Sequence, residues 1–68
     1  MTLEDYLVEC VWSKKEMARQ ANIDYVTFNR AIKGETITSH SANKIAHAIS
    51  QKLGRSVRWQ DIEGLNVK

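Results

Sequence analysis

The chain has 68 residues, ten of them Lys or Arg against eight Asp or Glu, a formal charge of +2 and a hydrophobic fraction of 43%. A chain this short forms one domain that buries only roughly 60% of its unfolded surface, which leaves no room for a large catalytic cleft. No apolar run approaches the roughly 20 residues that span a bilayer. The acidic start is unlike a secretory signal, and the single cysteine excludes an internal disulfide. We therefore expect a cytoplasmic protein.

Two helices are predicted in the N-terminal third. Thr2 is a candidate N-cap for the first, whose apolar residues are spaced by three and four: Leu3, Tyr6, Leu7, Cys10 and Val11. Ser13 and Glu16 have the spacing of a capping box, in which each side chain satisfies a free backbone N–H of the other. A second helix is therefore expected over about Lys14 to Ala21.

A third helix follows after a very short connection. Asn22 can end the second helix in the left-handed conformation, and Asp24 can cap a helix that ends at Gly34. Only residues 22–24 separate the two helices, which is typical of a helix-turn-helix. Ala18 lies where the helices would cross, and the other expected buried contacts are Met17, Ile23, Phe28 and Ala31.

The second half of the chain predicts two further helices. A helix is predicted over residues 39–53. Thr38 is its candidate N-cap, the hydrophobic residue Ile37 precedes that cap, and Gly54 ends the helix. Its apolar stripe consists of Ala42, Ile45, Ala46, Ile49 and Leu53. The segment VRWQDIEGL, residues 57–65, predicts a short fifth helix that stops near Gly64 and turns Trp59 and Ile62 inward. All five segments are helical, so the expected fold is a small all-α bundle.

The basic residues concentrate in the middle of the chain. The first twelve residues carry three acidic residues and no basic one, whereas residues 13–33 carry five basic residues: Lys14, Lys15, Arg19, Arg30 and Lys33. This asymmetry is compatible with polyanion binding, and equally with a solvated charged face.

The segment SKKEMARQANIDYVTFNRAIKG resembles the helix-turn-helix of the lambda-repressor-like (Cro/repressor-type, XRE-like) DNA-binding family. KIAHAIS followed by VRWQDI resembles that family's fourth and fifth helices, so the likeness covers roughly residues 3–63. The framework that carries it is Ala18, Ile23, Phe28 and Gly34. The resemblance implies one compact five-helix domain with a helix-turn-helix over about residues 14–33. It also implies sequence-specific DNA binding and a transcriptional regulator, usually a repressor, that inserts its third helix into the major groove.

Family roles can be carried over residue by residue. The resemblance assigns base-edge contacts to Tyr25, Val26, Thr27, Asn29 and Arg30. It assigns phosphate contacts to Ser13, Lys14, Lys33, Thr36, Thr38 and His40. The chemistry is suitable, because arginine pairs with guanine, asparagine with adenine, and valine contacts a thymine methyl. Helix N-termini also offer free N–H groups to phosphates.

Four positions depart from the family pattern. Lys14 stands where a glutamine often bridges phosphate and recognition helix, and Leu7 where some members have a phosphate-binding arginine. Val11 and Asn22 each replace a glycine that frequently ends a helix. The change at Val11 leaves the turn between the first two helices open.

Other functions remain as alternatives. The same fold can serve as a protein-interaction module, such as an antirepressor or adaptor; within DNA binding, an excision or recombination accessory factor or an antitoxin partner is also compatible. No catalytic set, phosphate loop or metal-ligand cluster appears, so we expect no enzyme activity, cofactor or metal. Residues from the C-terminal helix and tail are candidates for a homodimer surface: Trp59, Leu65 and Val67.

Overall fold

The computed structural model describes residues 1–68 and contains four α-helices, one 3-10 turn and two short strands. The helices are α1 (Leu3–Cys10), α2 (Lys14–Ala21), α3 (Tyr25–Ile32) and α4 (Ser39–Leu53). Strand β1 (Thr36–Ile37) precedes α4, and the 3-10 turn η1 (Trp59–Asp61) and strand β2 (Asn66–Val67) follow it.

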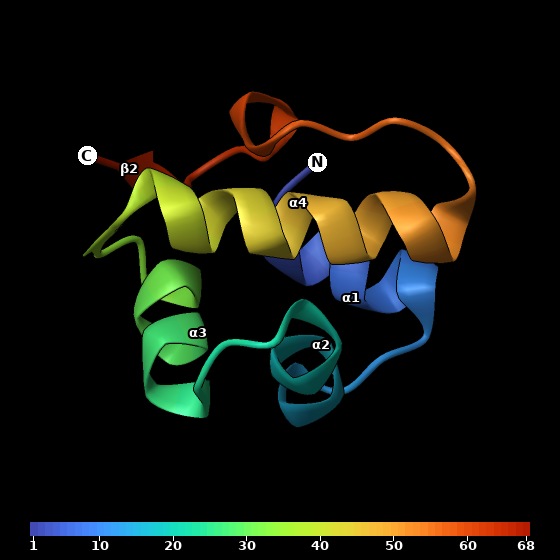
Figure 1. The fold of residues 1–68 in the computed structure, drawn as a ribbon, viewed down its shortest axis with the longest axis horizontal. Helices are drawn as coiled ribbons and strands as arrows, with labels where there is room; N and C mark the ends of the chain where they lie inside the picture. The colour runs from blue at the N-terminus through green and yellow to red at the C-terminus, as the bar shows by residue number, and fades with distance from the viewer.

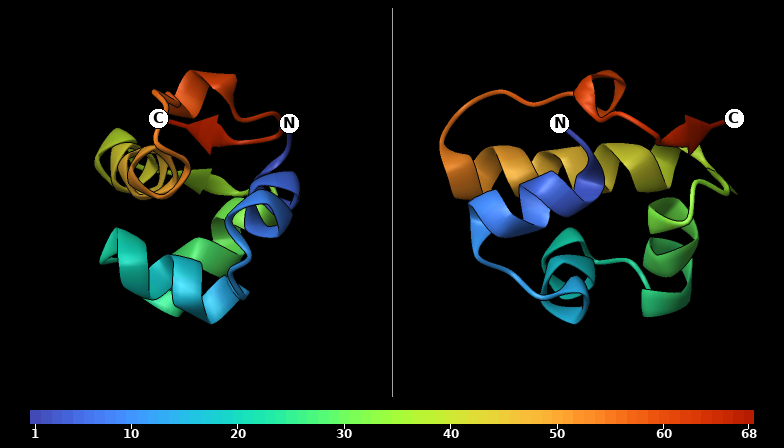
Figure 2. Two further views of the ribbon diagram at one scale, coloured as in Figure 1. Left: turned by 90° about the vertical axis from the view of Figure 1, so that its right-hand side faces the viewer. Right: turned by 180° about the vertical axis from the view of Figure 1, so that it is seen from behind.

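Helix α4 runs through the middle of the molecule and divides it into two sides. α2 and α3 lie below it in Figure 1, α1 lies behind it, and the C-terminal segment crosses above it. The view along α4 shows the same separation of the C-terminal segment from α2 and α3 (Figure 2). Most of the C-terminal segment therefore lies across α4 from the helix-turn-helix.

Side-chain caps fix where all four helices begin. The side chains of Thr2, Ser13, Asp24 and Thr38 each accept a hydrogen bond from the backbone N–H three residues later, at 2.7 to 3.2 Å. These bonds satisfy N–H groups that have no partner within the helix. The predicted starts of the four helices are confirmed.

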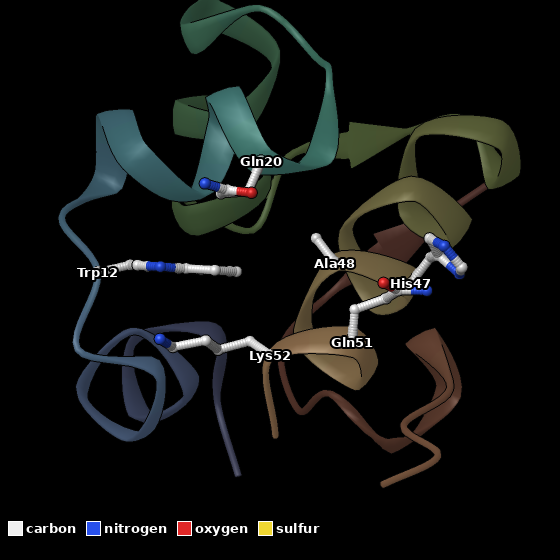
Figure 3. A pocket seen from close by; sticks show the side chains of 6 residues that line it. All are labelled: Trp12, Gln20, His47, Ala48, Gln51 and Lys52. Atoms are coloured by element: carbon white, nitrogen blue, oxygen red, sulfur yellow. The ribbon is translucent and has the colours of Figure 1, made fainter. Parts of the chain in front are cut away.

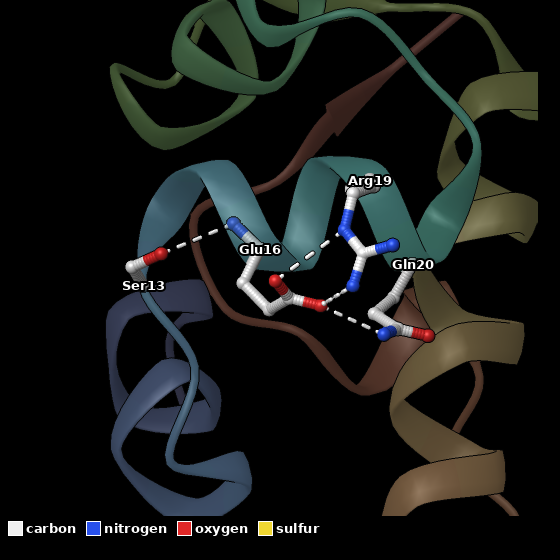
Figure 4. A network of polar contacts seen from close by, with 4 residues as sticks. All are labelled: Ser13, Glu16, Arg19 and Gln20. Atoms are coloured by element: carbon white, nitrogen blue, oxygen red, sulfur yellow. Dashed lines mark hydrogen bonds and ion pairs between the residues drawn. The ribbon is translucent and has the colours of Figure 1, made fainter.

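The predicted capping box at α2 is only half formed. Ser13 Oγ accepts from Glu16 N at 3.1 Å, but the Glu16 carboxylate does not return to the Ser13 backbone. It binds Arg19 Nη2 at 2.6 Å and Gln20 Nε2 at 2.7 Å instead (Figure 4). Hydrogen bonds from two side chains, one of them charged, stabilise the carboxylate better than a single bond from a backbone N–H.

Three helices end with the same backbone geometry. Val11, Asn22 and Gly34 have φ of 57°, 58° and 82°. In each case the N–H of the following residue binds the carbonyl five residues back, at 2.9 to 3.1 Å. This is the Schellman arrangement, which satisfies the last free carbonyls of a helix. Asn22 is left-handed as predicted, and the turn left open at Val11 has the same form.

The core lies where the four helices meet. Met17, Ala18, Phe28 and Ala31 are buried as predicted, and Ile23 is half-buried against the same cluster. The predicted stripe of α4 also faces inward: Ala42, Ile45, Ala46 and Ile49 are buried, and Leu53 is half-buried. The apolar residues of the helix-turn-helix thus pack against the apolar stripe of α4 in one core.

The prediction of a fifth α-helix is wrong. Residues 59–61 form only a three-residue 3-10 turn between Arg58 and Ile62, both of which are extended. Val57 is buried and its backbone is held by Ser50 Oγ, so the chain enters the segment extended. Ile62 points inward as expected, and Trp59 is half-buried against the core.

The tail pairs with other strands instead of forming a helix. β2 is parallel to β1, with Thr36 opposite Asn66 and Ile37 opposite Val67, and Lys68 N donates to Ile37 O at 3.0 Å. The fold is therefore mostly helical, with four helices and a small parallel sheet, and the expected five-helix all-α bundle is correct only in its first four helices.

Candidate nucleic-acid interface

The turn between α2 and α3 orients the second helix of the pair. α2 is seen nearly along its axis and α3 from the side in Figure 1, so the two helices cross steeply. Asp24 Oδ1 accepts from Thr27 N at 2.7 Å and fixes the first turn of α3. Hydrogen bonds from the Thr27 side chain and then its backbone N–H lower the pKa of Asp24. The carboxylate therefore stays charged at neutral pH and complements the helix dipole.

The five predicted base-contact residues differ in exposure. Val26 is 69% exposed and Tyr25 is 38% exposed, so both are exposed large hydrophobic side chains. Arg30 is exposed, whereas Thr27 and Asn29 are half-buried. Phe28, between them, is fully buried. One side of α3 thus anchors the helix, and the opposite side presents apolar and polar groups to solvent.

Two neighbours of this surface were not predicted from the sequence. Lys15 Nζ lies 5.7 Å from the Tyr25 ring centroid, a cation–π distance that links the start of α2 to the start of α3. Glu35 Oε1 lies 3.4 Å from Arg30 Nε. Glu35 follows the end of α3 and its own N–H is bound by Arg30 O at 2.9 Å. No sequence motif indicates either contact. The first depends on the turn between α2 and α3, and the second on the turn after α3.

Four of the predicted contact residues come together around one hollow. Thr27 and Arg30 from α3 line it with Thr36 and Thr38, and its volume is about 220 Å³. Ile37, Ser41 and Lys68 complete the lining. Two of its lining residues are basic and four carry a hydroxyl group, and none is Asp or Glu. Lys68 was missed in the sequence because only the pairing of β2 with β1 brings it there.

The remaining predicted phosphate contacts are exposed but lie elsewhere. Lys14 and Lys33 are exposed at the start of α2 and the end of α3. Ser13 is exposed and already accepts the cap bond from Glu16 N. His40 lines a different hollow, with Asn22 and Lys44, between α2 and α4. His40 therefore does not line the hollow that contains Thr36 and Thr38.

The proposed dimer residues are partly used inside the chain. Trp59, Leu65 and Val67 are all half-buried and pack against the chain's own core. Val67 is also paired with Ile37 in the sheet. The C-terminal dimer surface stays a prediction.

Other classes of site leave little trace in the structure. No group of three or more His, Cys, Asp or Glu side chains is arranged to hold a metal ion. Each of the four helices falls short of the length and apolar content needed to cross a membrane. Cys10 is buried, and burial raises the pKa of its thiol.

Comparison with known proteins gave no match. Neither a protein-family model, nor a curated protein, nor a solved structure matches this chain.

Proposed function

We propose that this protein is a sequence-specific DNA-binding regulator, of the repressor type that the lambda-repressor-like resemblance implies, and that α3 enters the major groove. The observation that supports this most is the outward side of α3. Val26 is 69% exposed and Arg30 is exposed, while the neighbouring Phe28 is fully buried. Direct readout of base edges requires apolar and hydrogen-bonding side chains on a well-anchored helix, and the exposed Val26 and Arg30 with the half-buried Asn29 supply them.

The charges around α3 suit a polyanion. Lys14, Lys15 and Lys33 are exposed on the helix-turn-helix, and the hollow beside α3 is lined by Arg30 and Lys68 and by no Asp or Glu. Phosphate contacts of this kind fix the position of a protein on DNA, and base contacts provide the specificity. In this proposal Arg30 pairs with guanine. To do so, the Arg30 side chain leaves its ion pair with Glu35 and binds the base.

The test is a salt titration of DNA binding with single variants. Lys14→Ala should weaken binding to all sequences and flatten the slope of log K against log salt by roughly one unit. Arg30→Ala should cost about 1–3 kcal/mol on the preferred site and relax its sequence preference. The matched control is Arg58→Ala, which removes the same charge directly before η1, across α4 from the helix-turn-helix.

One combined variant decides the assignment. If the Lys14→Ala and Arg30→Ala double variant binds a random DNA pool as well as the natural chain does, α3 is not the binding surface. In that case the natural chain and the variant would also select the same sequences from the pool.

A protein-interaction module is the second candidate. The exposed hydrophobic side chains Tyr25 and Val26 favour it, since such groups also occur at protein interfaces. An antirepressor or adaptor of this kind would bind DNA weakly at every salt concentration and show no sequence preference. An excision or recombination accessory factor would instead keep the DNA-binding behaviour.

A further inference from the structure

The two most exposed large hydrophobic side chains of the molecule lie together at the end of α1. Val8 is 79% exposed and Val11 is 86% exposed, and the half-buried Trp12 follows directly. We call these three residues the α1 corner. In Figure 1 the end of α1 lies at the opposite end of the molecule from α3. Single exposed apolar residues are ordinary, but several at one place mark an interaction surface.

Val11 is also in a backbone conformation that its side chain disfavours. Its φ is 57°, in the left-handed region, which β-branched residues rarely adopt. The equivalent positions at the ends of α2 and α3 hold Asn22 and Gly34, which tolerate this region. The Val11 side chain buries almost nothing within the chain, so no packing inside the monomer compensates for the conformation.

The largest hollow of the molecule adjoins the α1 corner. It has a volume of about 460 Å³ and lies between Trp12, which follows α1, and the helices α2 and α4. The Trp12 indole projects across it toward Ala48, with Lys52 alongside (Figure 3). Lys52 Nζ lies 5.9 Å from the centroid of the indole ring. The hollow therefore combines the Trp12 ring and Ala48 with polar side chains and one cation.

Charged side chains of both signs lie near the same corner and take no part in the ion pairs of the chain. Glu9 lies in the last turn of α1, and Lys52 Nζ lies 5.9 Å from the Trp12 ring centroid. Arg55 follows the end of α4, which lies at the same end of the molecule as the end of α1 (Figure 1). A foreign acidic partner would use the cations and be repelled by Glu9. A second copy of the same surface can use both signs.

We propose that the α1 corner binds the α1 corner of a second copy of this chain in a symmetric dimer. Such an interface pairs one patch with itself, so every residue of the patch meets its reciprocal contact. Val11 lies near the two-fold axis, and Glu9 of each copy faces Lys52 of the other. The dimer leaves α3 free in both copies and does not depend on DNA binding.

The first test is sedimentation equilibrium of the full chain at concentrations from about 10 µM to about 1 mM. This range covers the dissociation constants expected of a small interface. The natural chain should show a concentration-dependent dimer. Val11→Asn should raise the dissociation constant at least about tenfold, because it removes the apolar contact. A thermal melt followed by circular dichroism should show this variant folded, since asparagine suits the left-handed conformation. The matched control is Val26→Asn, the same change at an exposed valine of α3, which should leave the dimer unchanged.

The second test is a charge swap. Glu9→Lys and Lys52→Glu should each weaken the dimer, and the two together should restore it, which a purely structural role for either residue would not produce. A natural chain that stays monomeric up to about 1 mM would overturn the proposal. A dimer insensitive to Val11→Asn and to the charge changes would also overturn it, and would place the interface elsewhere, such as on the C-terminal surface.

Discussion

Val11 and Asn22 share one backbone conformation but have side chains of very different tolerance for it. Their φ angles are 57° and 58°, and both end a helix in the same hydrogen-bonded turn. For a residue with a Cβ atom the left-handed region costs about 1–2 kcal/mol, and asparagine reduces that cost through its short polar side chain. The sequence predicts the Asn22 conformation, because that residue type favours it. It does not predict the conformation of Val11, because nothing in valine indicates a left-handed turn.

The pair gives a matched test of this strain. Val11→Gly should increase the free energy of unfolding by about 1 kcal/mol, because relief of the strain exceeds the entropy that glycine adds to the unfolded chain. Asn22→Gly should be near neutral or slightly stabilising. Urea unfolding of both variants measures the difference. A loss above about 1 kcal/mol in Asn22→Gly would reject the left-handed conformation at that position.

Helix starts are decided within a few residues of sequence, and this is why they were predicted well. Thr2, Ser13, Asp24 and Thr38 cap the four helices at the expected positions. A cap needs only one side chain and a backbone N–H three residues later, so the rest of the fold has little influence on it. Glu16 shows where such local prediction fails. Several donors lie near its carboxylate, which binds Arg19 and Gln20 and not the Ser13 backbone.

The cap of α3 should make stability depend on pH. Hydrogen bonds from Thr27 lower the pKa of Asp24 below its ordinary value of 3.8. The folded state therefore binds the proton less readily than the unfolded chain. The contribution of this cap is fully present above pH 3.8 and is lost as the pH falls through the lower folded pKa.

The measurement is a thermal melt of Asp24→Ala at several pH values. At neutral pH the melting temperature should fall by about 4–8 °C, which is typical for the loss of a cap in a domain of this size. The difference from the natural chain should shrink below pH 3.8. Asp24→Asn is the control, because asparagine also caps but does not titrate. An Asp24→Ala effect that is constant from pH 7 to pH 2 would contradict the role of the charge.

At the scale of the whole molecule, the C-terminal segment is fastened to the rest of the chain at three places. Ser50 Oγ accepts from Val57 N at 2.8 Å and lies 3.0 Å from Val57 O. Glu63 N donates to Met1 O at 2.9 Å. β2 then pairs with β1. The last two contacts join segments distant in sequence, and all three hold the tail extended. The helix predicted over VRWQDIEGL therefore does not form.

Loss of the Ser50 hydroxyl should loosen this attachment. Ser50→Ala leaves the part-buried N–H of Val57 without its partner, and the free energy of unfolding should fall by about 1–3 kcal/mol. Ser56→Ala, at an exposed serine in the same connection, should change it by less than about 0.5 kcal/mol. Guanidinium unfolding followed by circular dichroism compares them. Equal effects of the two substitutions would show that the hydroxyl of Ser50 does not fasten the segment.

The sequence by itself determined the four helices, the short turn between α2 and α3, and which residues of α3 turn inward. Each depends on caps and on a periodicity that only a few neighbouring residues set. The tertiary structure alone decided the extended tail and the arrival of Lys68 at the hollow that Arg30 lines. Those features depend on strand pairing and packing between distant segments, whose free energy no local pattern encodes.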